Sequence, residues 1–239
     1  MILLRSALFN LIFFSLTFVL TLAGTVVRFV APQRVLDFAV AWARMLLWAA
    51  RVICGIDWQV HGELPTGAAL IASHHESAFD TLVWMTLVPR PAYVMKQEML
   101  RIPLFGALTR QAGMIAVDRT GGARAMRGLM RDAVRAVAAQ RQIVIFPEGT
   151  RAAPGAVLPL QPGIAALAAS TGLAVIPVVT DSGRCWGRRA FRKYPGVIHI
   201  VLLPPIPSGL RRQELLRRLE AALRTDVRTA AGPVDNSVG

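Results

Sequence analysis

A histidine and an aspartate five residues apart follow an apolar run in the stretch IASHHESAFDTLVW, residues 71–84. If Asp80 accepts the Nδ1 proton of His75, the Nε2 atom of the imidazole is left free to act as a general base. Residues at this spacing lie about 16 Å apart in a strand and point about 140° apart around a helix. Contact therefore requires a turn between a strand and a helix, a junction where α/β proteins commonly place their sites.

The same cluster is compatible with other chemistry. No G-x-S-x-G segment is present, which argues against an activated serine. A zincin needs a second histidine four residues after the first, and the histidines of this chain are His61, His74, His75 and His199. Metal ligation by His74, His75 and Asp80 and a purely structural polar turn remain alternatives. The prediction is a general-base pair that uses no metal.

Two further segments place arginines just beyond predicted strands. GMIAVDR ends at Arg119, and IVIFPEGTR supplies Glu148, Gly149, Thr150 and Arg151. Two guanidinium groups with nearby hydroxyl and backbone donors suit a phosphate monoester, because arginine presents a planar fork to its oxygens. Gly149 would allow close approach of the backbone. Alternatively, each arginine forms an ion pair with the acidic residue of its own motif.

Short apolar segments alternate with helical patterns from residue 57 onward. This alternation predicts an α/β domain with a mixed, partly parallel sheet flanked by helices. Continuously apolar segments such as IVIF and AVIPVV are typical of buried parallel strands. Strands are expected in WQVHG, AALIAS, AYVMK, MIAV, QIVIF, LAVIPVV and VIHIVLL, and helices near 80–87, 103–111, 122–140, 162–171 and 208–225.

The N-terminal segment is rich in apolar residues. Residues 6–27 carry no charge, and as a helix they would extend roughly 33 Å, about the thickness of a bilayer's hydrocarbon core. A retained transmembrane helix is predicted in preference to a cleaved signal, whose apolar core is shorter. The next apolar segment is interrupted by charges and contains Trp42 and Trp48, which favours a helix lying in the membrane interface. A buried core helix is the alternative.

These patterns divide the chain into three parts. Residues 1–56 are predicted to form a membrane anchor and an interfacial helix, residues 57–226 one α/β domain, and residues 227–239 a flexible tail. The boundary of the tail follows from its small, polar composition.

The chain is strongly basic, with a formal net charge of +13. Such a charge favours an anionic partner: nucleic acid, a phospholipid surface or a phosphorylated substrate. The loop at 183–193 interleaves arginines with aromatic residues, which suits a bilayer or single-stranded nucleic acid, and the apolar N-terminus favours the bilayer. The arginines of the helix at 122–140 are expected to form a solvated face. Cys54 and Cys185 lack metal-ligand spacing and are expected to be unpaired thiols.

The blocks HESAFD, GMIAVDR, FPEGTR and AVIPV occur in this order. Together with MKQEMLRIPLFG they resemble the glycerolipid acyltransferase family, most closely bacterial 1-acyl-sn-glycerol-3-phosphate acyltransferases. H-x4-D alone is a weak motif, but H-x4-D followed by FPEGTR is highly specific. The resemblance covers residues 57–205, and the anchor with its interfacial helix is also similar to bacterial members. One departure is Gln161, where many relatives have a lysine.

The resemblance implies roles for individual residues. His75 is the expected general base and Asp80 its orienting partner, and Arg119 and Arg151 belong to the acceptor's phosphate site. That site also includes Glu148, Gly149 and Thr150. The VIPV block at 175–178 is expected to help line the acyl-donor region.

The expected reaction moves a fatty acyl group from a thioester to the sn-2 hydroxyl of 1-acylglycerol 3-phosphate, giving phosphatidate. Acyl-CoA or acyl carrier protein would be the donor, lysophosphatidate the acceptor and an anionic membrane surface a further partner. No cofactor and no nucleic acid are expected, and the catalytic domain is placed on the cytoplasmic face of the inner membrane. An acyltransferase for another lysolipid, such as lyso-ornithine lipid, and a non-catalytic basic membrane-binding protein remain alternatives.

Overall fold

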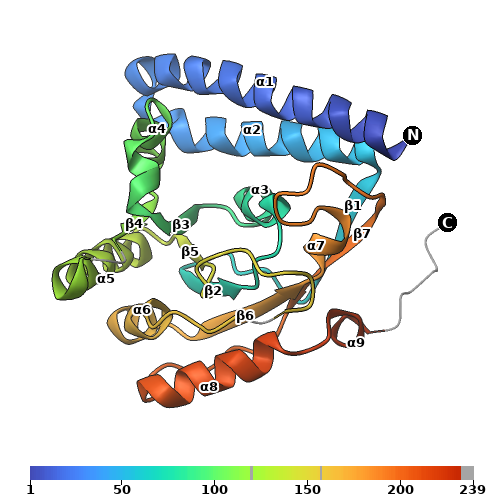
Figure 1. The fold of residues 1–239 in the computed structure, drawn as a ribbon. Coiled ribbons are helices and arrows are strands. Elements are labelled where there is room, and N and C mark those ends of the chain that lie inside the picture. The colour runs from blue at the N-terminus through green and yellow to red at the C-terminus, as the bar shows by residue number, and fades with distance from the viewer. Residues whose placement is uncertain (119–120, 157, 233–239) are drawn as a thin grey trace.

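The described part of the chain, residues 1–118, 121–156 and 158–232 of a computed structural model, folds around one seven-stranded sheet (Figure 1). The strand order is β1-β7-β6-β2-β5-β3-β4, and neighbouring strands are parallel except β6 and β7. The predicted mixed sheet is confirmed, and every predicted segment contains a strand. The strands are β1 (Ile56–His61), β2 (Ala69–Ser73), β3 (Pro91–Lys96), β4 (Ile115–Val117), β5 (Gln142–Ile145), β6 (Val175–Thr180) and β7 (Gly196–Leu202).

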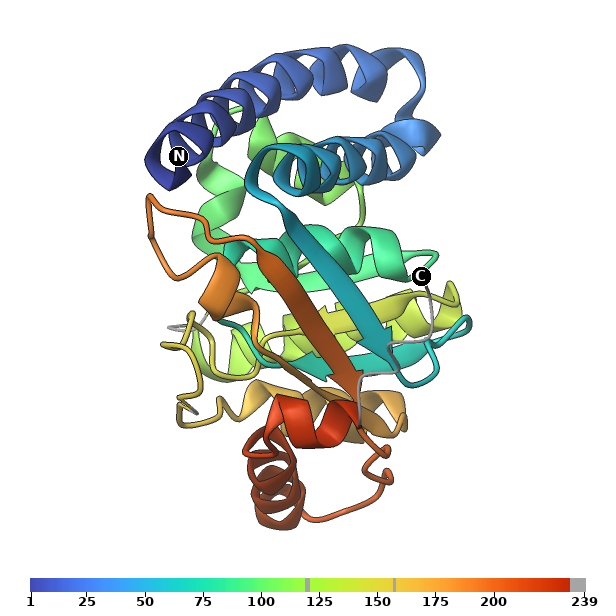
Figure 2. The same cartoon turned by 90° about the vertical axis from the view of Figure 1, so that its right-hand side faces the viewer.

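Helices cover both faces of the sheet, as the two views of Figures 1 and 2 show. Ile71 of β2 packs in a cluster with the helices α2 and α3, whereas Leu70 and Ala72 belong to the cluster of α5, α6 and α8. Because neither face meets solvent, the central strands are apolar throughout. The predicted helices are α3 (Ala78–Leu87), α4 (Phe105–Gln111), α5 (Gly122–Ala138), α6 (Gly163–Thr171) and α8 (Arg212–Leu223).

The elements at the C-terminal end of the chain differ from their predicted boundaries. The last predicted helix begins at Arg212 and not at 208, because Gly209 has a φ of 82° that a right-handed helix cannot include. The first residues of the predicted tail form the short helix α9 (Val227–Ala231). The Asp226 carboxylate accepts the N–H groups of Arg228 and Thr229 and so caps this short helix. Residues 233–239 lie outside the described residues.

The N-terminal helices form an antiparallel pair on one side of the domain (Figure 1). Helix α1 (Ile2–Val30) is long and apolar enough to cross a membrane by length and composition. It does not project away from the domain; it lies along α2 (Val35–Ala49), to which the 3₁₀ turn η1 (Pro32–Arg34) joins it. Its outer surface exposes large apolar side chains, including Leu4, Leu11, Phe14, Phe18, Val26 and Phe29.

Helix α2 has two different sides. Ala43, Leu46 and Leu47 are buried in the core cluster that contains α3 and the sheet, so the alternative of a core helix holds for this side. Trp48 and Met45 are exposed. A π-helical turn, η2 (Ala50–Cys54), then leads into β1. The interfacial position of α2 stays a prediction.

The beginning of α1 is fastened to the loop before β7. The Lys193 ammonium group donates to Asn10 Oδ1 at 2.6 Å, and the Lys193 backbone N–H donates to the buried Ser6 hydroxyl at 2.9 Å. The ammonium also lies over the rings of Phe9 and Trp186, which meet edge to face at 5.1 Å. These contacts hold the helix against the domain that carries β7.

Replacement of Lys193 tests this attachment. Lys193→Met keeps the apolar stem but removes the donors, so it should lower the free energy of unfolding by about 1–3 kcal/mol. Denaturant titration of the purified protein in detergent measures the change. The neighbouring Arg192 is exposed, and Arg192→Met is the matched control, expected to stay within about 0.5 kcal/mol of the wild type. Equal stability of both variants would show that Lys193 does not fasten α1.

Candidate active site

The turn between β2 and α3 is built by the start of the helix. Ser77 is the N-cap, and its hydroxyl accepts the N–H of Phe79. Asp80 occupies the third helical position and accepts the N–H of Ser77, which completes a capping box. The same oxygen, Oδ2, accepts the N–H of Glu76 at 2.8 Å. The carboxylate therefore fixes the backbone of the turn as well as the first turn of α3.

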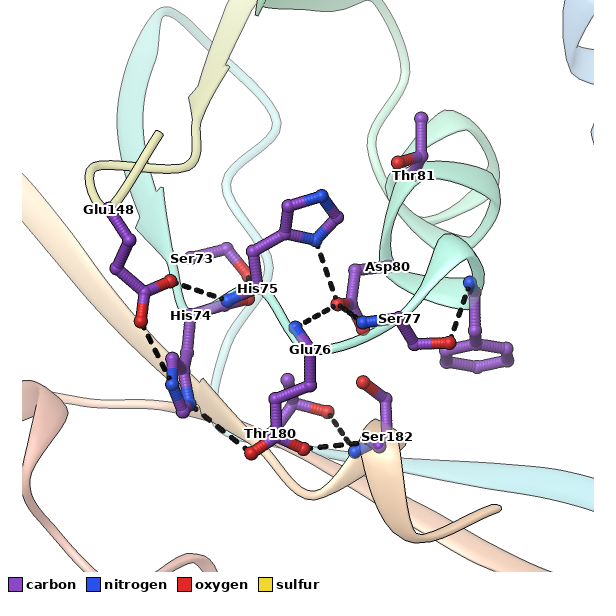
Figure 3. Close-up of polar contacts among 12 residues, drawn as sticks. Ser73, His74, His75, Glu76, Ser77, Asp80, Thr81, Glu148, Thr180 and Ser182 are labelled. Carbon is purple, nitrogen blue, oxygen red and sulfur yellow. Dashed lines mark hydrogen bonds and ion pairs between the residues drawn. The ribbon is translucent and has the colours of Figure 1, made fainter. Parts of the chain in front are cut away.

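His75 and Asp80 are in contact. The distance from His75 Nδ1 to Asp80 Oδ2 is 3.0 Å, and Figure 3 shows the imidazole ring directed toward the carboxylate. Asp80 is buried, whereas 12% of the His75 side chain is exposed. A neutral imidazole that donates to this carboxylate through Nδ1 would keep a lone pair on Nε2. The contact predicted from the sequence is present.

A second loop holds His75 from the other side. The His75 ring stacks on Phe146 with centroids 3.9 Å apart, and the His75 carbonyl accepts the N–H of Ala152 at 2.7 Å. Phe146 begins the FPEGTR segment, which turns directly after β5. Gly149 has a φ of 72°, a conformation that favours glycine, and its N–H closes the turn on the Phe146 carbonyl. The loop thereby brings Arg151 to the same end of the sheet.

The Glu148 carboxylate is directed into the protein. It is buried: Oε2 accepts the N–H of His75 at 2.9 Å, and Oε1 lies 3.0 Å from His74 Nε2. The alternative ion pair with Arg151 is absent from the ion pairs of the described residues. A carboxylate turned inward supports the backbone of His75 and would not bind an anionic phosphate. We infer that Glu148 positions His75, and its assignment to the phosphate site stays a prediction.

Arg151 supplies positive charge beside His75 and Asp80. Burial lowers the pKa of its guanidinium, Asp80 opposes this effect, and Arg188 and Arg189 lower the pKa further. The Arg151 side chain thus lies close enough to Asp80 and to the basic loop at 183–193 to interact electrostatically with both. Thr150 is exposed next to it. Arg119, the other predicted phosphate ligand, lies outside the described residues.

The VIPV block is strand β6, and its valines are core residues. Val175 and Val178 are fully buried, so the expectation that these two side chains line an acyl-donor surface is wrong. Their strand instead supports the site, because the Val178 carbonyl accepts the N–H of His74.

Sequence reasoning missed the part played by His74 and Glu76. Glu76 is buried and its two carboxylate oxygens accept the N–H groups of Gly155 and Gly183, each at 2.8 Å. His74 is an ion-pair partner of Glu148 and Glu76. Among the described residues no three His, Cys, Asp or Glu side chains are grouped to hold a metal ion. The sequence does contain a signal, because polar side chains lie on both sides of His75 directly after a strand that is apolar up to Ser73.

Comparison with known proteins assigns the class. Residues 57–181 match the sequence profile of the family described as Acyltransferase. A relative from Pseudomonas aeruginosa, named 1-acyl-sn-glycerol-3-phosphate acyltransferase, is 32% identical over 230 residues, covering 91% of this chain and 88% of that protein. The chain therefore belongs to the acyltransferase family, a class of group-transfer enzymes.

More distant relatives share the domain. A protein of the same name from Limnanthes alba is 32% identical over 68% of this chain, and the match spans 57% of its own length. The crystal structure of the 1-acyl-sn-glycerophosphate acyltransferase from Thermotoga maritima superposes with a TM-score of 0.71. The match covers 94% of this chain and 95% of that one, at 21% identity, and it establishes the common fold.

The capping box is open to a direct test. Ser77→Ala removes the acceptor for the Phe79 N–H and should lower the free energy of unfolding by about 0.5–2 kcal/mol. Thermal unfolding in detergent provides the measurement. Ser170→Ala is the control, because that hydroxyl bonds only to the Leu167 carbonyl inside α6, and a change below about 0.5 kcal/mol is expected. Identical effects of the two substitutions would contradict a special role for the cap.

Proposed function

We propose that this enzyme transfers a fatty acyl group from a thioester donor to the sn-2 hydroxyl of 1-acylglycerol 3-phosphate, giving phosphatidate. The observation that carries the proposal is the His75–Asp80 contact at a strand end next to Arg151. The name of the Pseudomonas relative, which aligns over nearly the whole chain, supports the choice of acceptor.

His75 is the general base in this proposal. Its Nε2 takes the proton of the sn-2 hydroxyl as that oxygen attacks the thioester carbonyl. The tetrahedral oxyanion then collapses, and the departing thiolate takes the proton back from His75. Asp80 stabilises the imidazolium in between and keeps the ring in its tautomer. General-base catalysis is worth roughly 10²–10⁴-fold, and holding two substrates in reactive geometry can contribute up to about 7–11 kcal/mol.

The acceptor's phosphate is assigned to Arg151, together with Arg119. A guanidinium binds phosphate oxygens through two parallel N–H donors, which fixes the orientation of the lipid as well as its position. Asp80 and Glu148, the carboxylates nearest to His75, are both buried and both accept backbone N–H groups. Because their negative charge is directed inward, it does not oppose the binding of a phosphate by Arg151. The arginines consequently determine the charge that an incoming headgroup meets.

The apolar surface of α1 supports attachment to a membrane. We propose that its exposed leucines and phenylalanines, with Trp48 of α2, enter the lipid and keep the site where acceptor and product reside. We further propose the cytoplasmic face of the inner membrane, where acyl-CoA or acyl carrier protein would supply the acyl chain. The basic loop at 183–193 begins within α7 (Ser182–Cys185) and is attached to the start of α1, a position that suits anionic lipid headgroups.

Substitution of the base tests the proposed function. His75→Ala should lower kcat by about 10²–10⁴-fold while circular dichroism shows an intact fold. The assay offers lysophosphatidate and lyso-ornithine lipid as acceptors, each with acyl-CoA and acyl carrier protein. His61→Ala, which replaces a histidine on β1, is the matched control and should keep wild-type turnover. Full activity of His75→Ala, or preference for the lyso-ornithine acceptor, would overturn the proposal.

The phosphate assignment predicts a different kinetic effect. Arg151→Ala should raise the KM for lysophosphatidate about 10- to 100-fold, because a charge-assisted hydrogen bond contributes about 1.5–3 kcal/mol. Arg151→Lys should recover part of the loss, since lysine restores the charge but not the fork. Arg131→Ala, on the outer face of α5, is the control. An unchanged acceptor KM in Arg151→Ala would place the phosphate elsewhere.

A further inference from the structure

A buried histidine lies between two buried carboxylates directly behind the base. Only 4% of the His74 side chain is exposed. Its Nε2 lies 3.0 Å from Glu148 Oε1 and 3.1 Å from the Ala156 carbonyl, and its Nδ1 lies 3.9 Å from Glu76 Oε1. Figure 3 shows the ring between the two glutamates. Nε2 thus faces both the Ala156 carbonyl and the Glu148 carboxylate.

The charges around His74 favour its protonated form. Burial alone would lower its pKa, but Glu148, Glu76 and the Ala156 carbonyl outweigh that effect and raise the pKa to about 9. Asp80, on α3, faces Glu76 and adds a further negative charge to the cluster. The β6–α7 segment contributes a backbone donor, Gly183 N–H, to Glu76. An imidazolium here compensates two carboxylates that would otherwise be buried without a cation, an arrangement that costs several kcal/mol.

The same residues are connected to His75 by an ion pair and hydrogen bonds. Glu148 pairs with His74 through one oxygen and accepts the His75 N–H through the other. Glu76 holds the loops at Gly155 and Gly183. A side chain added at Gly183 would lie 2.9 Å from Glu76 Oε2, so the packing leaves little freedom. One cation therefore secures the carboxylate that holds the backbone of His75.

We propose that His74 is a positioning residue for acyl transfer: its imidazolium holds Glu148 and Glu76 in place, and through them the backbone that aims His75 at the acceptor hydroxyl. The inference rests on the function proposed above. In this proposal His74 does not touch the substrate, but it affects the rate of acyl transfer through the position of His75.

Loss of the His74 proton should be visible in the pH dependence. Because the folded-state pKa lies above the ordinary value of about 6.5, the stabilisation is fully present below pH 6.5 and is lost as the pH rises through about 9. The carboxylates then repel each other without a cation between them. The turnover number should therefore fall on the alkaline side.

The experiment measures kcat and acceptor KM from pH 6 to 10 for the wild type, His74→Gln, Glu76→Gln and His61→Gln. The wild type should show an alkaline decrease centred near pH 9. His74→Gln should lower kcat at neutral pH by about 10- to 100-fold with little change in KM, as expected of a misplaced base, and should lose this alkaline decrease. His61→Gln, the matched control, should follow the wild type.

Glu76→Gln provides a second test that keeps His74. Because the Glu76 charge raises the pKa of His74, its removal should move the alkaline decrease to lower pH. Two results would overturn this inference alone. One is an active wild type whose kcat stays constant up to pH 10, and the other is a His74→Gln variant with wild-type kcat and an unchanged alkaline decrease. A wild type inactive on lysophosphatidate would overturn the proposed function and this inference with it. The wild-type and Glu76→Gln profiles decide the matter even if His74→Gln fails to fold.

Discussion

Three N–H groups converge on one oxygen of Asp80: two from the backbone of the turn and one from the His75 ring. The backbone bonds cap α3 and set the path of residues 74–77, and the ring bond sets the tautomer of the base. Folding and chemistry therefore depend on the same carboxylate. A neutral amide at this position could offer its oxygen to the same three donors, but it would lack the negative charge that stabilises a protonated imidazole.

The other acidic side chains near the site follow the same pattern. Glu76 and Glu148 are buried, each accepts backbone N–H groups, and His74 compensates their charge. The negative charge of the HESAFD and FPEGTR segments is thus directed into the protein, where it joins the ends of β2, β5 and β6. The exposed charged side chains around His75 are arginines. This separation explains how a site rich in carboxylates can receive an anionic lipid.

The fold was largely predictable because its signals are local. Apolar segments such as IVIF, with no polar residue to face solvent, identify buried parallel strands, and the H-x4-D spacing requires a turn that the Ser77 cap supplies. The orientation of Glu148 was not predictable, because its partners His74 and His75 follow another strand, β2, and only the register of β2 with β5 brings them together. The attachment of α1 through Lys193 depends equally on contacts distant in sequence. The start of α8 was mispredicted because arginine and leucine periodicity outweighed the single Gly209.

The position of the proton on the His75 ring can be measured directly by the ¹⁵N chemical shifts of its imidazole nitrogens. Protein labelled with ¹⁵N-histidine would be studied in detergent at about pH 8, where an ordinary imidazole is neutral. The His75 signals would be assigned by their loss in His75→Ala. We predict a protonated Nδ1 coupled to Asp80 and an unprotonated Nε2. A spectrum in which Nε2 carries the proton and Nδ1 does not would contradict the account.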